Sequence, residues 1–242
     1  MSGHSKWAQI KHKKALTDAK KGKIFSKMAR LISIAAKEKG ADPAMNPKLR
    51  MAVETARSAG MPKENVTRAI ERAAGAGAKE NLEEVRYEAY GPEGTALLIF
   101  GVTDSRNRTT NEIKHLLSEN DGKLAAEGSV SWMFKKTGAV DFPKETIARP
   151  LDDFVLKLIE AGAEDVREFA EGYTAYVDPA ALDTFKARLA EKKIPAGEPH
   201  IDYVPQNPIS VPPEAKAKLE KLEEQLDEHD DIQEVFTNMN DE

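Results

Sequence analysis

The first thirty residues combine cationic and aromatic side chains in a way that suits the binding of a polyanion. They hold nine lysines and arginines and a single acid, a formal charge of +8, whereas the whole chain carries −5. Lysine and arginine neutralise phosphate groups, and aromatic rings can stack on nucleic-acid bases. The rings in this segment belong to Trp7, His12 and Phe25. Because charge and rings occur together, the segment predicts a contact with nucleic acid.

The amino-terminal residues expected to make this contact are Lys6, Trp7, Lys11, His12, Lys13, Lys14, Lys20, Lys21 and Lys23. A solvated lysine-rich tail would explain the charge equally well, but such a tail gains nothing from a tryptophan. The apolar stretch 31–36 is too short for a secretory signal, and a mitochondrial transit peptide would be richer in arginine and serine. We therefore expect residues 1–21 to form a flexible basic arm of the mature protein.

A second candidate contact lies in residues 104–110, DSRNRTT, where a buried strand is expected to end and a helix to begin. Backbone N–H groups at a helix N-terminus favour an anion, and arginine can hold a phosphate through two parallel hydrogen bonds. Arg106 and Arg108 would then form a second anchor for nucleic acid. The alternative is that Asp104 or Ser105 caps the helix and the two arginines pair with nearby acids. The sequence supports both interpretations about equally.

No other combination of residues indicates catalysis or a metal site. The five histidines are scattered, and none forms the H-E-x-x-H pattern of zinc hydrolases. A metal could bind at 229–231, but the polar end of a helix is the simpler explanation. The glycine-rich residues 75–79 follow a helix, whereas a phosphate-binding loop follows a strand. We expect no enzyme activity, no catalytic residue, no metal, no cofactor and no small-molecule substrate.

The composition is typical of a soluble, partly helical protein. Charged residues make up 32% of the chain, and no run of about 18 apolar residues could cross a membrane. The chain has no cysteine, which fits a reducing compartment. We therefore expect a cytoplasmic protein without a membrane partner, and 242 residues allow one to three domains.

Three short helices are expected to follow the arm and form a helical domain over residues 22–80. Apolar residues recur at helical spacing from Phe25 to Ala36, and Gly40 is placed to end that helix. Asn46 and Pro47 predict the cap and first position of a second helix, and a third opens at 62. Further cations on the outer faces are interpreted as solvated helix surfaces, since glutamates dilute them: Lys48, Arg50, Arg57, Lys63, Arg68 and Arg72.

Beyond residue 80 the pattern changes to strands and helices, so the predicted fold class is α+β. Residues 136–205 have the order β-α-β-β-α-β, which is the ferredoxin-like arrangement. Residues 81–135 with 206–242 predict a second unit of the same kind, into which the first is inserted. Its expected strands are 95–103, 129–134, 208–211 and 232–236, and its helices are 107–119 and 213–228, with a hairpin strand at 85–90. The alternative is that the last helix only packs across the outside.

The carboxyl-terminal residues from 213 onward are rich in acids and hold only three lysines. The simplest interpretation is a surface helix with an acidic outer face. A sharper hypothesis is that this helix competes with nucleic acid for the basic arm.

Several short motifs resemble the bacterial YebC family, which includes the mitochondrial translational activator of cytochrome oxidase subunit one. They extend over essentially the whole chain: GHSKW at 3–7, IKHKK at 10–14, NP at 46–47, MPK at 61–63, YGP at 90–92, TD at 103–104, RNRT at 106–109, GSV at 128–130, AGAED at 161–165 and DIQ at 231–233. The departures are small, with Ser105 where asparagine is usual and Phe100 where an acid is expected.

The resemblance implies one helical and two α/β domains, no known catalytic activity, and one of two roles. Members are described either as DNA-binding transcriptional regulators or as ribosome-associated translation factors that relieve stalling at proline-rich stretches. We favour RNA and the ribosome, because a lysine-rich arm suits the phosphates of folded rRNA. DNA is the second candidate, since three short helices leave a base-reading helix possible. A scaffold that binds only proteins through the acidic carboxyl-terminal face is the third.

Overall fold

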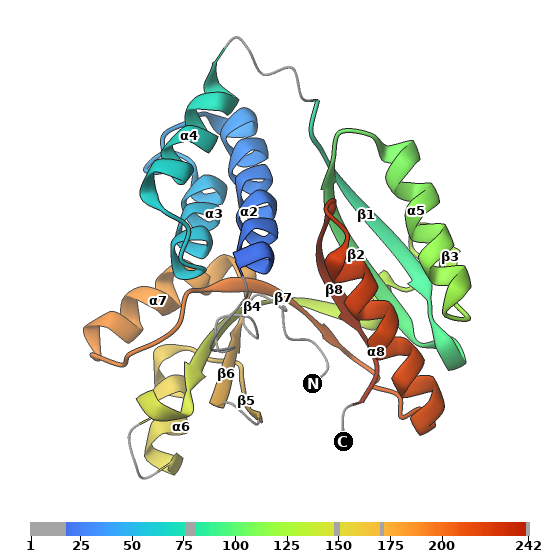
Figure 1. Ribbon diagram of the computed structural model, residues 1–242. Coiled ribbons are helices and arrows are strands. Elements are labelled where there is room, and N and C mark those ends of the chain that lie inside the picture. Colours follow the sequence, from blue (N-terminus) through green and yellow to red (C-terminus); the bar gives the residue numbers. More distant parts are fainter. Residues whose placement is uncertain (1–17, 76–80, 148–150, 170–171, 241–242) are drawn as a thin grey trace. The chain divides into compact units, whose positions relative to one another are not determined.

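The structure is a computed structural model that describes residues 18–75, 81–147, 151–169 and 172–240 (Figure 1). These residues are α+β, as expected, with helices first and α/β elements after them. The chain divides into two compact units, one made of Lys135–Val204 and the other of the residues before and after it. None of the helices in the described residues is long and apolar enough to cross a membrane.

The three expected helices are present as α2 (Asp18–Lys39), α3 (Pro47–Ser58) and α4 (Lys63–Ala74). They share one apolar core, to which each contributes fully or largely buried side chains: Met28, Ile32, Leu49, Val53, Ala56 and Val66. Asn46 joins the first two helices. Its side-chain oxygen accepts from the backbone N–H of Leu49 at 3.0 Å, and its nitrogen donates to the carbonyls of Ala35 and Gly40 at 2.7 and 2.8 Å. The predicted cap is therefore confirmed, and it also closes the end of α2.

A four-stranded antiparallel sheet follows, with the strand order β3-β1-β2-β8. Its strands are β1 (Glu83–Tyr90), β2 (Ala96–Thr103), β3 (Lys123–Ala125) and β8 (Ile232–Thr237). The helices α5 (Arg106–Glu119) and α8 (Pro213–Glu228) pack together on one face of it (Figure 1). Leu117 and Leu222, both fully buried, meet the side chains of Tyr87 and Ile99 there. The last helix thus packs on this sheet rather than lying apart from it.

Two of the strands expected in this sheet are wrong. Residues 129–133 form no strand; instead a 3-10 turn, η2 (Ser131–Met133), occupies three of them, and the connecting strand is β3. Near 208–211 only Ile209 makes a bridge, to Met239. With the hairpin strand at 85–90 included, the expected chain order is β-β-α-β-β-α-β, whereas the observed order is β-β-α-β-α-β. The physical reason is that the buried carboxylate of Glu88 accepts the backbone N–H groups a strand at 129–134 would donate to a neighbour.

The elements of the inserted unit follow the order predicted from the sequence. Its elements are β4 (Phe134–Pro143), α6 (Leu151–Ala161), β5 (Asp165–Phe169), β6 (Gly172–Val177), α7 (Leu182–Glu191) and β7 (His200–Pro205). They follow the order β-α-β-β-α-β in the chain, and the strands lie side by side as β5-β6-β4-β7. This confirms the ferredoxin-like arrangement for the unit. The finer division of the remaining residues into 22–80 and 81–135 with 206–242 stays a prediction.

Candidate nucleic-acid interface

The predicted contact residues of the arm divide at the start of α2. Lys6, Trp7, Lys11, His12, Lys13 and Lys14 lie outside the described residues. Lys20, Lys21 and Lys23 lie in the first two turns of α2, with Lys20 and Lys21 exposed and Lys23 partly so. The positive charge of the arm therefore continues onto a regular helix.

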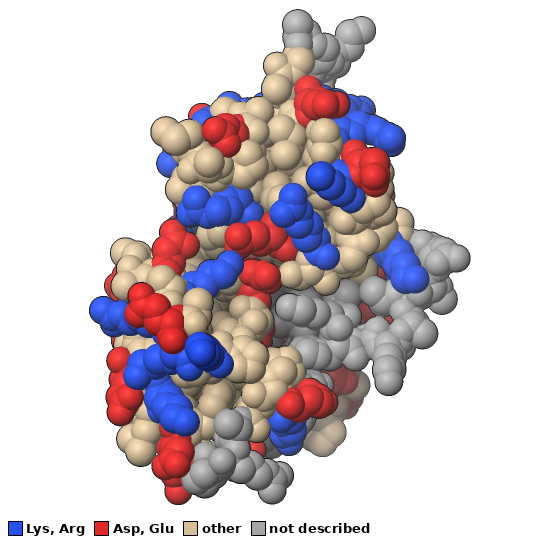
Figure 2. Space-filling view, turned by 90° about the vertical axis from the view of Figure 1, so that its left-hand side faces the viewer, with Lys and Arg blue, Asp and Glu red and all other residues tan. Residues whose placement is uncertain are grey.

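The helical part of the chain is itself strongly basic. Residues 18–75 hold thirteen lysines and arginines against six acids. Figure 2 shows lysine and arginine side chains spread over this part, at the top of the view, with acidic side chains between them. Lys48 is an example of the mixing, because its ammonium lies 2.8 Å from Glu38 and 2.7 Å from Glu84. This mixture of charges agrees with the solvated helix faces inferred from the sequence. Residues 18–75 nevertheless keep an excess of positive charge.

The loop that carries the second candidate contact lies between β2 and α5. Ser105 is at the N-cap of α5 but makes no side-chain cap; its backbone N–H donates to the hydroxyl of Thr103 at 2.9 Å. Arg106 donates from Nε and Nη2 to Glu83 at 3.1 and 3.0 Å, and its side chain is 57% exposed. The structure thus pairs Arg106 with an acid, and leaves its guanidinium largely open to solvent.

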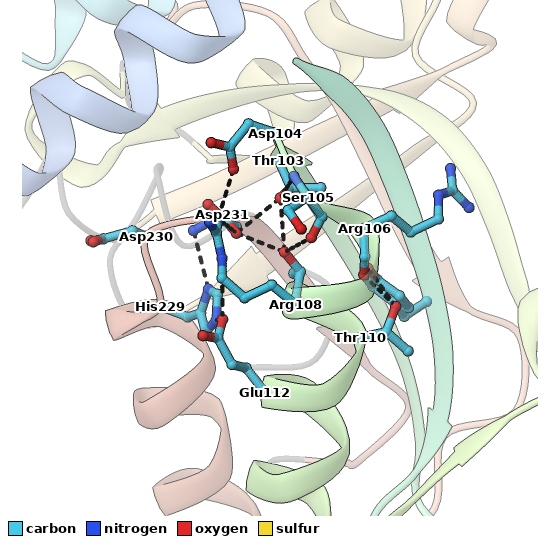
Figure 3. Close-up of polar contacts among 12 residues, drawn as sticks. Thr103, Asp104, Ser105, Arg106, Arg108, Thr110, Glu112, His229, Asp230 and Asp231 are labelled. Atoms are coloured by element: carbon cyan, nitrogen blue, oxygen red, sulfur yellow. Dashed lines mark hydrogen bonds and ion pairs between the residues drawn. The ribbon is translucent and has the colours of Figure 1, made fainter. Parts of the chain in front are cut away.

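Arg108 is held more firmly than Arg106. Its Nη2 donates to Asp104 and to Asp231, at 2.8 Å in both cases (Figure 3). Hydrogen bonds and charge from these two carboxylates raise the pKa of the guanidinium above its usual range. Any phosphate at this position would have to share Arg108 with two acids.

Asp231 is the centre of this cluster, and its side chain is 2% exposed. One carboxylate oxygen lies 2.7 Å from the hydroxyl of Thr109, 3.0 Å from that of Thr103 and 2.8 Å from Arg108, while the other accepts from Arg30. Burial raises the pKa of Asp231, but the hydrogen bonds outweigh it and hold the pKa well below its ordinary value. The carboxylate therefore stays charged and joins α2, β2, α5 and the start of β8.

Hydrogen bonds and an ion pair connect the basic helix α2 to the end of the acidic helix α8. Lys27, which is almost fully buried, donates from Nζ to the carbonyl of Asp227 at 2.6 Å. Arg30 donates to the carbonyl of Asp230 at 3.1 Å, and Lys23 lies 3.8 Å from the carboxylate of Asp230. The carbonyls at a helix C-terminus carry partial negative charge and favour cations. The acidic carboxyl-terminal segment therefore contacts the residues that continue the arm; competition with nucleic acid stays a prediction.

Within the part of the chain that the structure describes, Glu112, His229 and Asp231 form a group that could ligate a metal, with ligand atoms within 4.8 Å of one another. His229 already accepts the backbone N–H of Asp231 at 3.1 Å on Nδ1, and its Nε2 lies 2.8 Å from Glu112. Both oxygens of Asp231 accept from guanidinium groups. A cation would have to displace two arginines, so the group is explained as an ion-pair network at a helix end.

Sequence reasoning did not identify the pairing of Arg30 with Asp231 in this cluster, nor the role of Glu88 in β1, although 229–231 was considered as a metal site. The partners of these residues lie far away in the chain, so no local spacing indicates them. The available signals were two motifs of the family resemblance, GSV at 128–130, which Glu88 binds, and DIQ at 231–233, which begins with Asp231.

Comparison with known proteins matches almost the whole chain. Residues 5–76 match the family model described as the TACO1/YebC protein N-terminal domain, and residues 82–239 match the TACO1/YebC second and third domain. A probable transcriptional regulatory protein of Desulfitobacterium hafniense is 43% identical, over 98% of this chain and 95% of its own. One of Fervidobacterium nodosum is 46% identical over 98% and 93%. The crystal structure of a conserved hypothetical protein from Aquifex aeolicus has a TM-score of 0.87 and 40% identity, covering 97% of this chain and 96% of that one.

Proposed function

Since the chain belongs to the TACO1/YebC family, we propose that it regulates gene expression by binding nucleic acid through its basic amino-terminal segment, without catalysing a reaction. The relatives' name, probable transcriptional regulatory protein, supports a regulatory role. The finer proposal is a ribosome-associated translation factor that relieves stalling at proline-rich stretches. A DNA-binding transcriptional regulator is the second candidate, and the names of the relatives favour it.

The observation that carries the proposal is the distribution of charge. The first thirty residues have a formal charge of +8 on a chain that carries −5, and the excess of acids lies beyond residue 75, because residues 18–75 hold thirteen lysines and arginines against six acids. The acidic residues beyond 75 repel a polyanion, which favours its main contact with the basic amino-terminal part of the chain. Within that segment, the exposed Lys20 and Lys21 place part of the charge on α2.

Each residue of the interface has a proposed part. The lysines of the arm and of α2 neutralise phosphates and release counterions, which gives affinity without sequence preference. Trp7 and His12 stack on bases or lie against a sugar. Arg106 is the better placed of the two loop arginines to reach a phosphate, since it is paired with a single partly exposed acid and is itself 57% exposed. Arg108 would contribute only by sharing its guanidinium.

The test replaces four arm lysines and leaves the chain at full length. In the variant Lys6→Gln, Lys11→Gln, Lys13→Gln, Lys14→Gln we expect loss of ribosome co-sedimentation. The logarithm of the affinity for single-stranded RNA should also depend less on the logarithm of salt concentration, by a slope of about 0.7 for each phosphate that is no longer neutralised.

The matched control removes the same charge from exposed lysines of other elements: Lys114→Gln, Lys136→Gln, Lys193→Gln, Lys221→Gln. It should bind and pellet as the unchanged chain does. Equal behaviour of the two variants would show that overall charge, and not the arm, controls binding. Crosslinking in cells with sequencing of both RNA and DNA separates the two candidate functions.

A further inference from the structure

Trp132 is a large aromatic side chain that is mostly exposed to solvent, although it lies in a folded part of the protein. It is 62% exposed, whereas Phe134, two residues further on, is buried. Its indole N–H donates to the carbonyl of Ser129 at 2.9 Å. The polar edge of the ring is thus already satisfied within the chain, so the ring offers mainly its faces to a ligand.

The backbone that carries Trp132 is fixed by a buried carboxylate. Glu88, which is 2% exposed, accepts backbone N–H groups from Gly128 at 2.9 Å, Val130 at 2.7 Å and Ser131 at 3.0 Å. Burial raises the pKa of Glu88, but these three bonds outweigh it and lower the pKa below its ordinary value. The turn is therefore held by charge-assisted hydrogen bonds to a carboxylate that stays ionised.

A second support comes from the segment that follows β7. The side-chain amide of Gln206 donates to the carbonyl of Trp132 at 3.0 Å, and its backbone N–H donates to that of Met133 at 2.8 Å. The ring is consequently presented on a backbone held from two sides. A side chain fixed in this way loses little conformational entropy when it binds a ligand.

The carbonyl that accepts from the indole also accepts from a second aromatic residue, and that residue has a cation beside its ring. The hydroxyl of Tyr90 donates to the same Ser129 carbonyl at 3.3 Å, and Nζ of Lys123 lies 5.9 Å from the centre of the Tyr90 ring. The exposed indole and this lysine are thus connected through Ser129 and Tyr90. The combination matches a nucleotide, since a base can stack on the indole and an ammonium can neutralise a phosphate.

We propose that Trp132 is a stacking surface for an unpaired base of the nucleic acid that this chain binds. The inference rests on the proposed function and adds a contact far from the basic arm in sequence. Stacking does not depend on base identity, because every base has an aromatic face. Duplex nucleic acid, whose bases are already stacked on one another, is not a ligand for this surface.

The experiment uses the fluorescence of Trp132 itself. The chain has two tryptophans, so the variant Trp7→Phe leaves Trp132 as the only one. We expect a single-stranded oligoribonucleotide to quench its emission, and the same strand annealed to its complement to leave it unchanged at equal phosphate concentration. Proline-rich peptides can pack on tryptophan rings as bases do, but we expect such a peptide to leave the emission of Trp132 unchanged.

A second readout separates stacking from charge. In the otherwise unchanged chain, Trp132→Ala should weaken binding of the single strand about tenfold, and Trp132→Phe should restore most of it. The salt dependence should stay the same, since the number of neutralised phosphates does not change. Met45→Ala, at an apolar side chain that is 79% exposed, is the matched control and should bind as the unchanged chain does.

The outcomes distinguish this inference from the function on which it rests. Salt-dependent binding through the arm without quenching of Trp132 would overturn the stacking surface and leave the proposed function in place. Quenching by the peptide and not by the oligoribonucleotide would assign the surface to a protein partner instead. If the unchanged chain bound neither RNA nor DNA, the proposed function and this inference would fall together.

Discussion

Asp231 is a buried, charged carboxylate at the centre of the cluster between β2, α5 and α2. A buried carboxylate is costly unless charges and hydrogen bonds replace the water it loses. Asp231 obtains two hydroxyls and two guanidiniums, and its pKa is lowered in spite of burial. Its role in the structure is to hold together elements that are distant in the chain.

We predict that Asp231→Asn lowers the free energy of unfolding by about 2 kcal/mol. Removing one partner of a buried pair leaves the other uncompensated, but Arg30 and Arg108 are partly exposed and recover some hydration. Unfolding in urea measures the change. Asp230→Asn is the matched control, since that side chain is 74% exposed and should cost less than about 0.5 kcal/mol. Equal stability of the two variants would contradict the account.

The same carboxylate predicts how stability depends on pH. The pKa of Asp231 is lower in the folded state, so on acidification the unfolded chain takes up the proton first. The contribution of Asp231 is complete above the unfolded pKa of about 3.9 and is lost as pH falls below it. The difference in unfolding free energy between the unchanged chain and Asp231→Asn should therefore be constant from neutral pH to about pH 5 and shrink below about pH 4. A difference that stays constant in acid would refute this.

The sequence was sufficient to predict that Arg106 and Arg108 lie at the start of a helix, but it was not sufficient to predict which groups they pair with. Spacing along the chain identified the loop and the anion-binding potential of its backbone. The acids that pair with these arginines include Glu83 and Asp231, which are 23 and 123 residues away. Only the folded chain brings them together, which is why phosphate and carboxylate partners looked equally suitable beforehand.

At the scale of elements, local signals predicted the helices well and the strands of the first sheet less well. The helix α8, Pro213–Glu228, was expected at its observed bounds, because apolar periodicity and proline act within a few residues. Residues 129–134 alternate like a strand, yet their backbone donors are used by Glu88 from β1. The strand that does complete the sheet, β3, spans only Lys123–Ala125, too short to leave a pattern.

This account of the 128–131 turn makes a prediction for Glu88→Gln. A neutral amide binds three backbone N–H groups less strongly than a carboxylate, and its own N–H₂ faces donors, so we expect a loss of about 1–3 kcal/mol. Hydrogen exchange at the amides of Gly128, Val130 and Ser131 should become faster.

The control for that exchange experiment is Glu127→Gln, where the side chain is 87% exposed. It should leave the three amides as protected as before. Unchanged protection in Glu88→Gln would mean that the turn is held by something other than the buried carboxylate.

At the scale of the whole molecule, the proposed function rests on the contrast between a basic amino-terminal part, which includes the helical residues 18–75, and the acidic residues that follow it. The first thirty residues carry a formal +8 within a chain of −5. Family resemblance and charge were both visible in the sequence, because both are properties of composition and short motifs. The hydrogen bonds of Lys27 and Arg30 to the carbonyls at the end of α8 were not visible in the sequence, since they join residues about 200 apart.

Photocrosslinking of the full-length chain to nucleic acid in cells shows whether the basic amino-terminal segment makes the main contact, once the crosslinked peptides and the attached nucleotides are identified. The account predicts that the main crosslinked peptides come from residues 1–30 and that the attached nucleotides are ribonucleotides. Crosslinks confined to other parts of the chain, with residues 1–30 unmodified, would contradict it.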